Sequence, residues 1–147
     1  MGKDTVNGID VLPHREPFLF LDRVVEAGEK SSVGTVTFGP ERDFFRGHFP
    51  EYPIVPGVIL LEAMAQSAAA GVLALHRDGA IVDKSEIMLF AGADNVRFRR
   101  QVRPGDTFTT HAQVLKVGHG MGKFHVCGEV GGEIAAEADI FCVARKG

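Results

Sequence analysis

The chain has 147 residues, of which 45% are hydrophobic and 24% are charged. This length and composition fit one domain over residues 1–147, and they exclude a disordered tail, a collagen-like fibre and a low-complexity array. The formal net charge of −3 argues against a general nucleic-acid binder. Two cysteines, Cys127 and Cys142, are too few for a disulfide scaffold or a zinc site.

The first 56 residues combine short apolar segments with a proline-rich loop. Residues 9–16 predict a helical turn or loop. The apolar segment from Phe18 to Glu26 and the alternating segment from Ser32 to Phe38 predict two strands. Four prolines between Gly39 and Pro56 then predict a fixed, irregular loop.

The segment from Gly57 to Leu75 is long and apolar, and its single charged residue is Glu62. It is long enough to span a membrane, but it is rich in Ala, Gly, Ser and Gln and lacks flanking aromatic anchors. We therefore expect a buried helix in a soluble protein without membrane association. The first ten residues contain no apolar core of signal-peptide length, which predicts a cytoplasmic location.

Strand-like segments separated by turns follow the helix. The helix is expected to end before a turn at Arg77–Gly79. The expected strands cover residues 87–99, 106–117, 123–130 and 133–144. Together with the two earlier strands, they predict an α+β fold in which a curved antiparallel sheet wraps one long helix.

The dipeptide Gly131-Gly132 predicts a tight hairpin between the last two strands. The register that this turn implies places Cys127 opposite Ala136 and Cys142 opposite Met121. The two thiols are therefore not expected to be cross-strand partners.

Glu62 is the only ionisable side chain in the predicted helix. A buried carboxylate is costly unless it is paired or has a function. Gln66 lies four residues further on, so it shares a helix face with Glu62 and can hydrogen-bond it. The pattern alone supports equally a functional carboxylate and a structural one bonded to the backbone or to an arginine.

His48 lies between Gly47 and Phe49 in the proline-fixed loop. Imidazole titrates near neutral pH, so this side chain is a candidate proton-transfer group; a structural histidine bonded to a loop carbonyl is the alternative. Pro56-Gly57 begins the helix, where free N–H groups can polarise a carbonyl oxygen. A base, a carboxyl group and a carbonyl polariser fit chemistry beside a thioester or another acyl carbonyl.

Four arginines lie within seven residues: Arg97, Arg99, Arg100 and Arg103. They predict either a solvated strand edge that discourages aggregation or a docking patch for an acidic partner or a phosphate. The remaining histidines lack metal-ligand spacing, and most are expected at the surface or in turns: His14, His76, His111, His119 and His125. We expect no metal site.

A set of ordered motifs resembles the FabZ-type 3-hydroxyacyl-acyl-carrier-protein dehydratases over about Ile9 to Arg145. The motifs are Leu12–Arg15, Pro17–Leu19, Asp22–Val24, Gly47–Pro50, Pro53–Ile54, Pro56–Val58, Glu62–Gln66, Phe98–Arg100 and Pro104–Asp106. The resemblance implies a hot-dog fold. It also implies dehydration of a (3R)-hydroxyacyl thioester to the trans-2-enoyl thioester in type II fatty-acid synthesis.

The resemblance further implies roles for particular residues. His48 would remove the proton at C2, and Glu62 would orient the 3-hydroxyl group and help it to leave. The substrate-binding residues would be Pro56, Gly57, Val58 and Gln66, with the Gly57 N–H stabilising the oxyanion. No metal or redox cofactor is implied.

The same resemblance implies two kinds of partner. An acidic acyl carrier protein would deliver the substrate and dock on the four arginines. The family forms homodimers, often three per hexamer, in which His48 of one chain faces Glu62 of the other.

Three features depart from the family pattern or divide its branches. Glu16 stands where the family commonly has an aromatic residue near the tunnel mouth, which argues against gating by an aromatic flap. Glu51-Tyr52 replaces the usual small and basic pair, so this loop is expected to contact a different surface. Glu62, rather than Asp, favours the dehydratase-only branch over the dehydratase-isomerases.

Two other functions share the predicted fold. An acyl thioesterase would use the helix carboxylate to activate water, but it has no need for a base placed over C2. A non-catalytic acyl-binding protein would need neither His48 nor Glu62. The sequence therefore favours the dehydratase over both.

Overall fold

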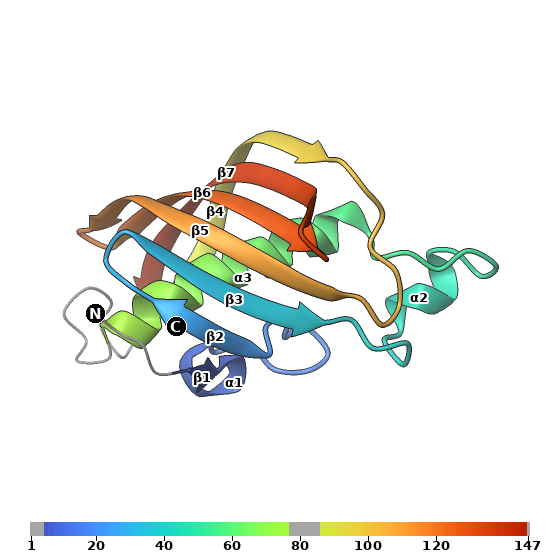
Figure 1. Ribbon diagram of the computed structural model, residues 1–147. Helices are drawn as coiled ribbons and strands as arrows, with labels where there is room; N and C mark the ends of the chain where they lie inside the picture. The colour runs from blue at the N-terminus through green and yellow to red at the C-terminus, as the bar shows by residue number, and fades with distance from the viewer. Residues whose placement is uncertain (1–4, 77–85, 147) are drawn as a thin grey trace.

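Seven antiparallel strands form one curved sheet that wraps around a long helix (Figure 1). The computed structural model describes residues 5–76 and 86–146, and the turn predicted at Arg77–Gly79 lies outside these ranges. The strand order is β1-β2-β3-β5-β6-β7-β4. The strands are β1 (Val6–Asn7), β2 (Arg23–Ala27), β3 (Ser31–Thr37), β4 (Glu86–Phe98), β5 (Thr107–Gly118), β6 (Met121–Val130) and β7 (Glu133–Lys146). This is the α+β architecture that the sequence pattern predicts, and it is the hot-dog fold that the family resemblance implies.

Helix α3 (Gly57–Leu75) runs along the hollow side of the sheet. Its residues from Ala63 to Val72 are all buried, so the helix is covered on every face. Small residues let the strands approach closely, because a Cβ on Gly71 would clash with the Ser32 Oγ of β3. By length and hydropathy α3 could cross a membrane, but 61% of its most apolar window is buried in this protein.

The first predicted strand is only partly correct. β2 covers the second half of that segment, whereas residues 16–21 form an irregular segment across α3, here called the strap. Leu19, Phe20 and Leu21 of the strap are buried. The apolar pattern that predicted a strand therefore reflects packing against the helix, and the strap's backbone has partners outside the sheet.

The proline-rich loop contains one unexpected turn of helix. α2 (Phe44–Gly47) interrupts residues 39–56, and a second short helix, α1 (Gly8–Val11), lies within the expected N-terminal turn. The Phe45 side chain is 5% exposed. Burial of this side chain stabilises α2 against the prolines on either side.

The final hairpin forms where the sequence predicts it, with Val130 paired with Glu133. A β-bulge between Gly128 and Glu129 then shifts the pairing by one residue. The predicted positions of both cysteines are therefore wrong by one residue: Cys127 lies opposite Glu137, and Cys142 lies opposite Gly122. Both are free thiols and, as expected, do not face each other.

Candidate active site

His48 lies just after α2, in a cavity of about 350 Å³ at the N-terminal end of α3. Its Nδ1 lies 3.1 Å from the carbonyl oxygen of Ile54. Because a carbonyl oxygen can only accept a hydrogen bond, Nδ1 carries the proton in this contact and Nε2 is left with a lone pair. The ring also stacks on Phe49, with the centroids 4.2 Å apart. His48 therefore makes the structural bond to a loop carbonyl through Nδ1, and its Nε2 can still act as a base.

The first residues of α3 share this cavity with His48. Pro56 makes no side-chain cap, and its carbonyl oxygen accepts from the N–H groups of Ile59 and Leu60. The N–H groups of Gly57 and Val58 precede those two and point out of the helix end. A Cβ on Gly57 would lie 2.9 Å from the Phe98 ring, so glycine lets this ring pack against the start of the helix.

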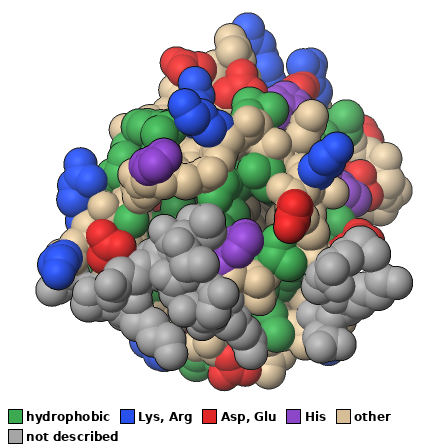
Figure 2. All heavy atoms as spheres, turned by 90° about the vertical axis from the view of Figure 1, so that its left-hand side faces the viewer, with side chains coloured by type: hydrophobic (Ala, Val, Ile, Leu, Met, Phe, Trp, Pro, Cys, Tyr) green, Lys and Arg blue, Asp and Glu red, His purple; other side chains and the backbone are tan. Residues whose placement is uncertain are grey.

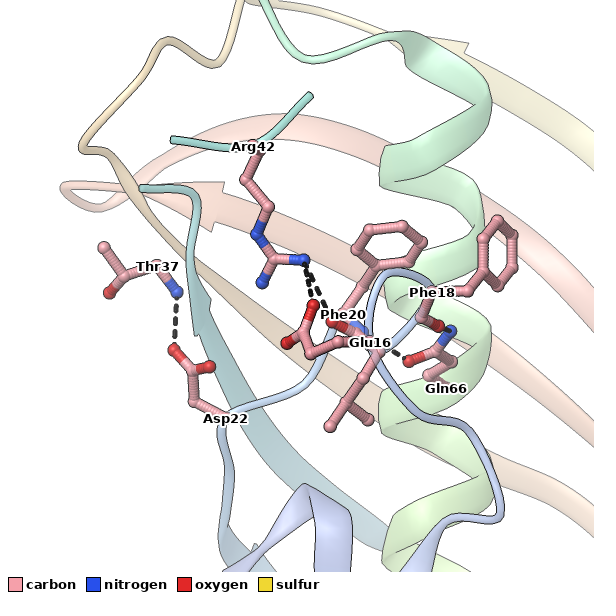
Figure 3. Close-up of polar contacts among 8 residues, drawn as sticks. Glu16, Phe18, Phe20, Asp22, Thr37, Arg42 and Gln66 are labelled. Atoms are coloured by element: carbon pink, nitrogen blue, oxygen red, sulfur yellow. Dashed lines mark hydrogen bonds and ion pairs between the residues drawn. The ribbon is translucent and has the colours of Figure 1, made fainter. Parts of the chain in front are cut away.

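Gln66 fixes the position of Glu62 on α3. The Gln66 side chain is 1% exposed. Its Nε2 donates to Glu62 Oε2 at 2.9 Å. The same Nε2 donates to the Phe18 carbonyl oxygen at 3.0 Å, and Oε1 accepts from the Phe20 N–H at 2.7 Å (Figure 3). One amide therefore ties the carboxylate to the strap, as the i, i+4 spacing predicts for the first of these bonds.

Glu62 and Gln66 line a second, much smaller cavity, of about 20 Å³. Its other walls are His14, Ala65, Ala69, Met88, Phe90 and Cys142. Burial, together with the charge of Glu62, raises the pKa of the Cys142 thiol to about 12, so this thiol stays protonated. The two cavities share no lining residue. Within one chain, His48 and Glu62 therefore lie at different places.

His14 is a site residue that the sequence analysis missed. Most of the remaining histidines are expected at the surface or in turns, but His14 is half-buried, with Nε2 3.6 Å from Glu62 Oε2. Burial lowers the pKa of His14, and the charge of Glu62 only partly offsets this effect. The one available signal was its place in the Leu12–Arg15 motif.

Over residues 5–76 and 86–146, no three His, Cys, Asp or Glu side chains group as metal ligands.

Only two of the four arginines line the His48 cavity. Arg99 and Arg100 line the cavity and form ion pairs with Glu137 and Glu133, respectively. Arg103 donates to the Tyr52 hydroxyl at 3.2 Å and lies over its ring, 5.4 Å from the centroid. Arg97 donates to the neighbouring carbonyl of Val96.

Two of the departures from the family pattern contact arginines. Tyr52 packs against Arg103 as described. Glu16 begins the strap and lies 3.5 Å from Arg42, which also donates to the Leu19 carbonyl oxygen at 3.1 Å (Figure 3). Glu16 therefore forms an ion pair at the position where the family commonly has an aromatic residue.

Comparison with known proteins places the chain in one family. The FabA-like domain family matches residues 12–139. A 3-hydroxyacyl-[acyl-carrier-protein] dehydratase FabZ from Idiomarina loihiensis is 44% identical over 99% of this chain and 95% of its own length. Among solved structures, the dehydratase heterocomplex ApeI:P from Xenorhabdus doucetiae has a TM-score of 0.78 at 19% identity, covering 96% of this chain and 92% of its own. A thioesterase from Haemophilus influenzae has a TM-score of 0.58 at 12% identity, covering 86% of this chain and 78% of its own. Likeness of fold alone therefore does not separate the two activities.

The three hydrogen bonds of Gln66 predict a large stability effect. In Gln66→Met the side-chain volume is kept, but the Phe20 N–H and the Phe18 carbonyl lose their partner. We expect the free energy of unfolding to fall by about 2–4 kcal/mol, because buried backbone groups left unpaired cost about 1–3 kcal/mol each. Urea denaturation measures this free energy of unfolding.

The matched control is Gln113→Met, at an exposed position of β5. It should change stability by no more than about 0.5 kcal/mol. Equal stability of the two variants would contradict the role of Gln66 in holding the strap.

Proposed function

The chain belongs to the FabA-like domain family, and we propose that it dehydrates a (3R)-hydroxyacyl thioester carried on an acyl carrier protein to the trans-2-enoyl thioester. This reaction is a step of type II fatty-acid synthesis in the cytoplasm. The observation that carries the proposal is that His48, with its Nδ1 engaged by the Ile54 carbonyl oxygen, lines the same cavity as Gly57. The reaction is redox-neutral, and the proposed mechanism assigns its proton transfers and the C–O cleavage to protein groups alone.

The proposed mechanism divides the reaction among His48, the first N–H groups of α3 and Glu62. His48 Nε2 removes the C2 proton, which the adjacent thioester carbonyl makes acidic. The N–H of Gly57, with that of Val58 beside it at the end of α3, stabilises the charge that develops on the carbonyl oxygen. The C3–O bond then breaks while Glu62 holds the hydroxyl group, which takes a proton from His48 or Glu62 and leaves as water.

The separation of the two cavities supports a site shared between two chains. Gly57 lines the His48 cavity, whereas Glu62 lines the smaller cavity, and the two have no lining residue in common. The oxyanion donors and the carboxylate of one chain therefore serve different cavities. A second copy resolves this, with His48 and Gly57 of one chain facing the partner's Glu62.

The outer edge of β4 supports pairing with that second copy. β4 is an edge strand that pairs only with β7 among the described elements. Its side chains Leu89, Phe90 and Phe98 are 43%, 37% and 52% exposed. A long apolar edge strand is a template for pairing with another chain. We propose a homodimer through β4, with three such dimers in a hexamer.

A short crotonyl thioester distinguishes the proposed activity from its rivals. A dehydratase also catalyses the reverse hydration, so the ultraviolet absorbance of the enone should fall while the thioester remains intact. Release of free thiol would instead identify a thioesterase, and no reaction would support a binding protein.

Two substitutions test the catalytic assignment. His48→Ala and Glu62→Gln should each lower kcat by about 10²–10⁴-fold, the usual contribution of a general acid or base, with the fold retained by circular dichroism. His125→Ala, at a half-exposed position of β6 bonded to Asp139, serves as the histidine control. Activity within a few-fold of wild type in either site variant would refute its assigned role.

The arginines around the His48 cavity support docking of an acidic carrier protein. Residues 99–103 follow the end of β4, at the opposite end of the molecule from the face shown in Figure 2. The face shown in Figure 2 mixes acidic and basic side chains with exposed hydrophobic ones. A substrate arm that enters the His48 cavity passes Arg99 and Arg100.

Arg100 provides the test of docking. Arg100→Gln removes one charge and a partly exposed ion pair of small energetic value. We expect kcat/KM on carrier-protein substrates to fall about 10-fold at low salt, with a much smaller loss on N-acetylcysteamine mimics. The difference should shrink as salt screens the charges.

The control for this measurement is Arg145→Gln. Arg145 is exposed near the end of β7 and, like Arg97, donates to a neighbouring carbonyl, that of Ala144. Equal losses of Arg100→Gln on both substrate types, or losses matched by Arg145→Gln, would make the arginines structural.

A further inference from the structure

His14 approaches the catalytic carboxylate from a part of the chain 48 residues away. Its Nε2 lies 3.6 Å from Glu62 Oε2, the same oxygen that accepts from Gln66 Nε2 at 2.9 Å. His14 also lines the small cavity beside Glu62. The proposed mechanism assigns it no role.

The backbone on both sides of His14 is fixed. Leu12 is 3% exposed, and its N–H donates to the Gly8 carbonyl oxygen. The Arg15 guanidinium donates to the carbonyl oxygens of Leu12 and of His14 itself, at 2.9 and 2.7 Å. Three residues beyond Arg15, the strap is bonded to Gln66. The backbone that positions the His14 imidazole beside Glu62 is therefore held by hydrogen bonds on both sides.

The environment of His14 selects one form of its ring. Burial lowers the pKa of His14, so the ring is neutral at neutral pH. Its Nδ1 is buried and has no hydrogen-bond partner among the described residues. A buried N–H without a partner is costlier and rarer than an unpaired acceptor. The proton therefore belongs on Nε2, pointing toward Glu62.

We infer that His14 is a positioning residue that, with Gln66, holds Glu62 Oε2 from the protein side and so leaves Oε1 for the 3-hydroxyl group of the substrate. The inference rests on the proposed dehydratase function. At 3.6 Å the contact is longer than a hydrogen bond, and such contacts tighten when substrate completes the site. A neutral donor suits this role because a cationic side chain would compete with the substrate's 3-hydroxyl group for the Glu62 carboxylate.

Two substitutions separate the donor from the bulk of the ring. In His14→Gln the side-chain amide can place an N–H near the position of Nε2, whereas His14→Met fills similar space without a donor. We expect His14→Met to lower kcat about 10- to 100-fold, with KM changed less than about 3-fold, because misplacing a catalytic group costs turnover rather than binding. His14→Gln should stay within about 3-fold of wild type.

The control is His111→Met. His111 Nε2 also lies 3.6 Å from a glutamate, Glu129, but on the strands β5 and β6 outside both cavities. The His111→Met substitution should leave kcat unchanged. Wild-type kcat in folded His14→Met, or equal losses in the Met and Gln variants, would overturn the inference. If the wild-type protein itself fails to hydrate a crotonyl thioester, the proposed function fails instead.

A second measurement needs no variant and no turnover. Nitrogen NMR of the imidazole rings in the wild-type protein reports which nitrogen of His14 carries the proton. We expect Nε2–H at neutral pH. A proton on Nδ1 would leave no donor facing Glu62 and would overturn the inference.

Discussion

The side-chain amide of Gln66 is the interaction on which the arrangement of this site depends. It is buried on α3, and its two polar atoms satisfy two backbone groups of the strap and one oxygen of Glu62. A carboxylate on this largely buried helix would otherwise face a desolvation cost. The same bonds that make Glu62 tolerable also fix the strap, and the strap in turn follows the segment that carries His14.

The division of the site between two cavities follows from the length of a helical turn. In the proposed mechanism the end of α3 supplies oxyanion donors to one cavity, and the carboxylate, about one and a half turns further along the helix, lines the other. A single copy of the chain would then hold two half-sites with different chemistry. The exposed apolar edge of β4 supports an assembly in which each half-site meets the complementary half of a second copy.

Local signals in the sequence predicted the long helix, the final hairpin and the catalytic candidates, because each depends on residues close together in the chain. The strap was mistaken for a strand because its apolar residues pack against α3, while its backbone partner is a side chain more than 40 residues away. The bulge at Gly128 shifted the cysteine register without any turn residue to mark it. His14 was missed for a similar reason, since its approach to Glu62 depends on how the N-terminal segment crosses the helix.

Co-expression of His48→Ala and Glu62→Gln chains tests the shared site most directly. In a mixed dimer one site would carry both lesions and the other neither. Random pairing makes about half of the dimers mixed, each with one of its two sites intact, so roughly a quarter of wild-type activity should return. If His48 and Glu62 instead acted within one chain, every site would keep one lesion. A folded, dimeric mixed species with only the activity of the inactive parents would contradict the account.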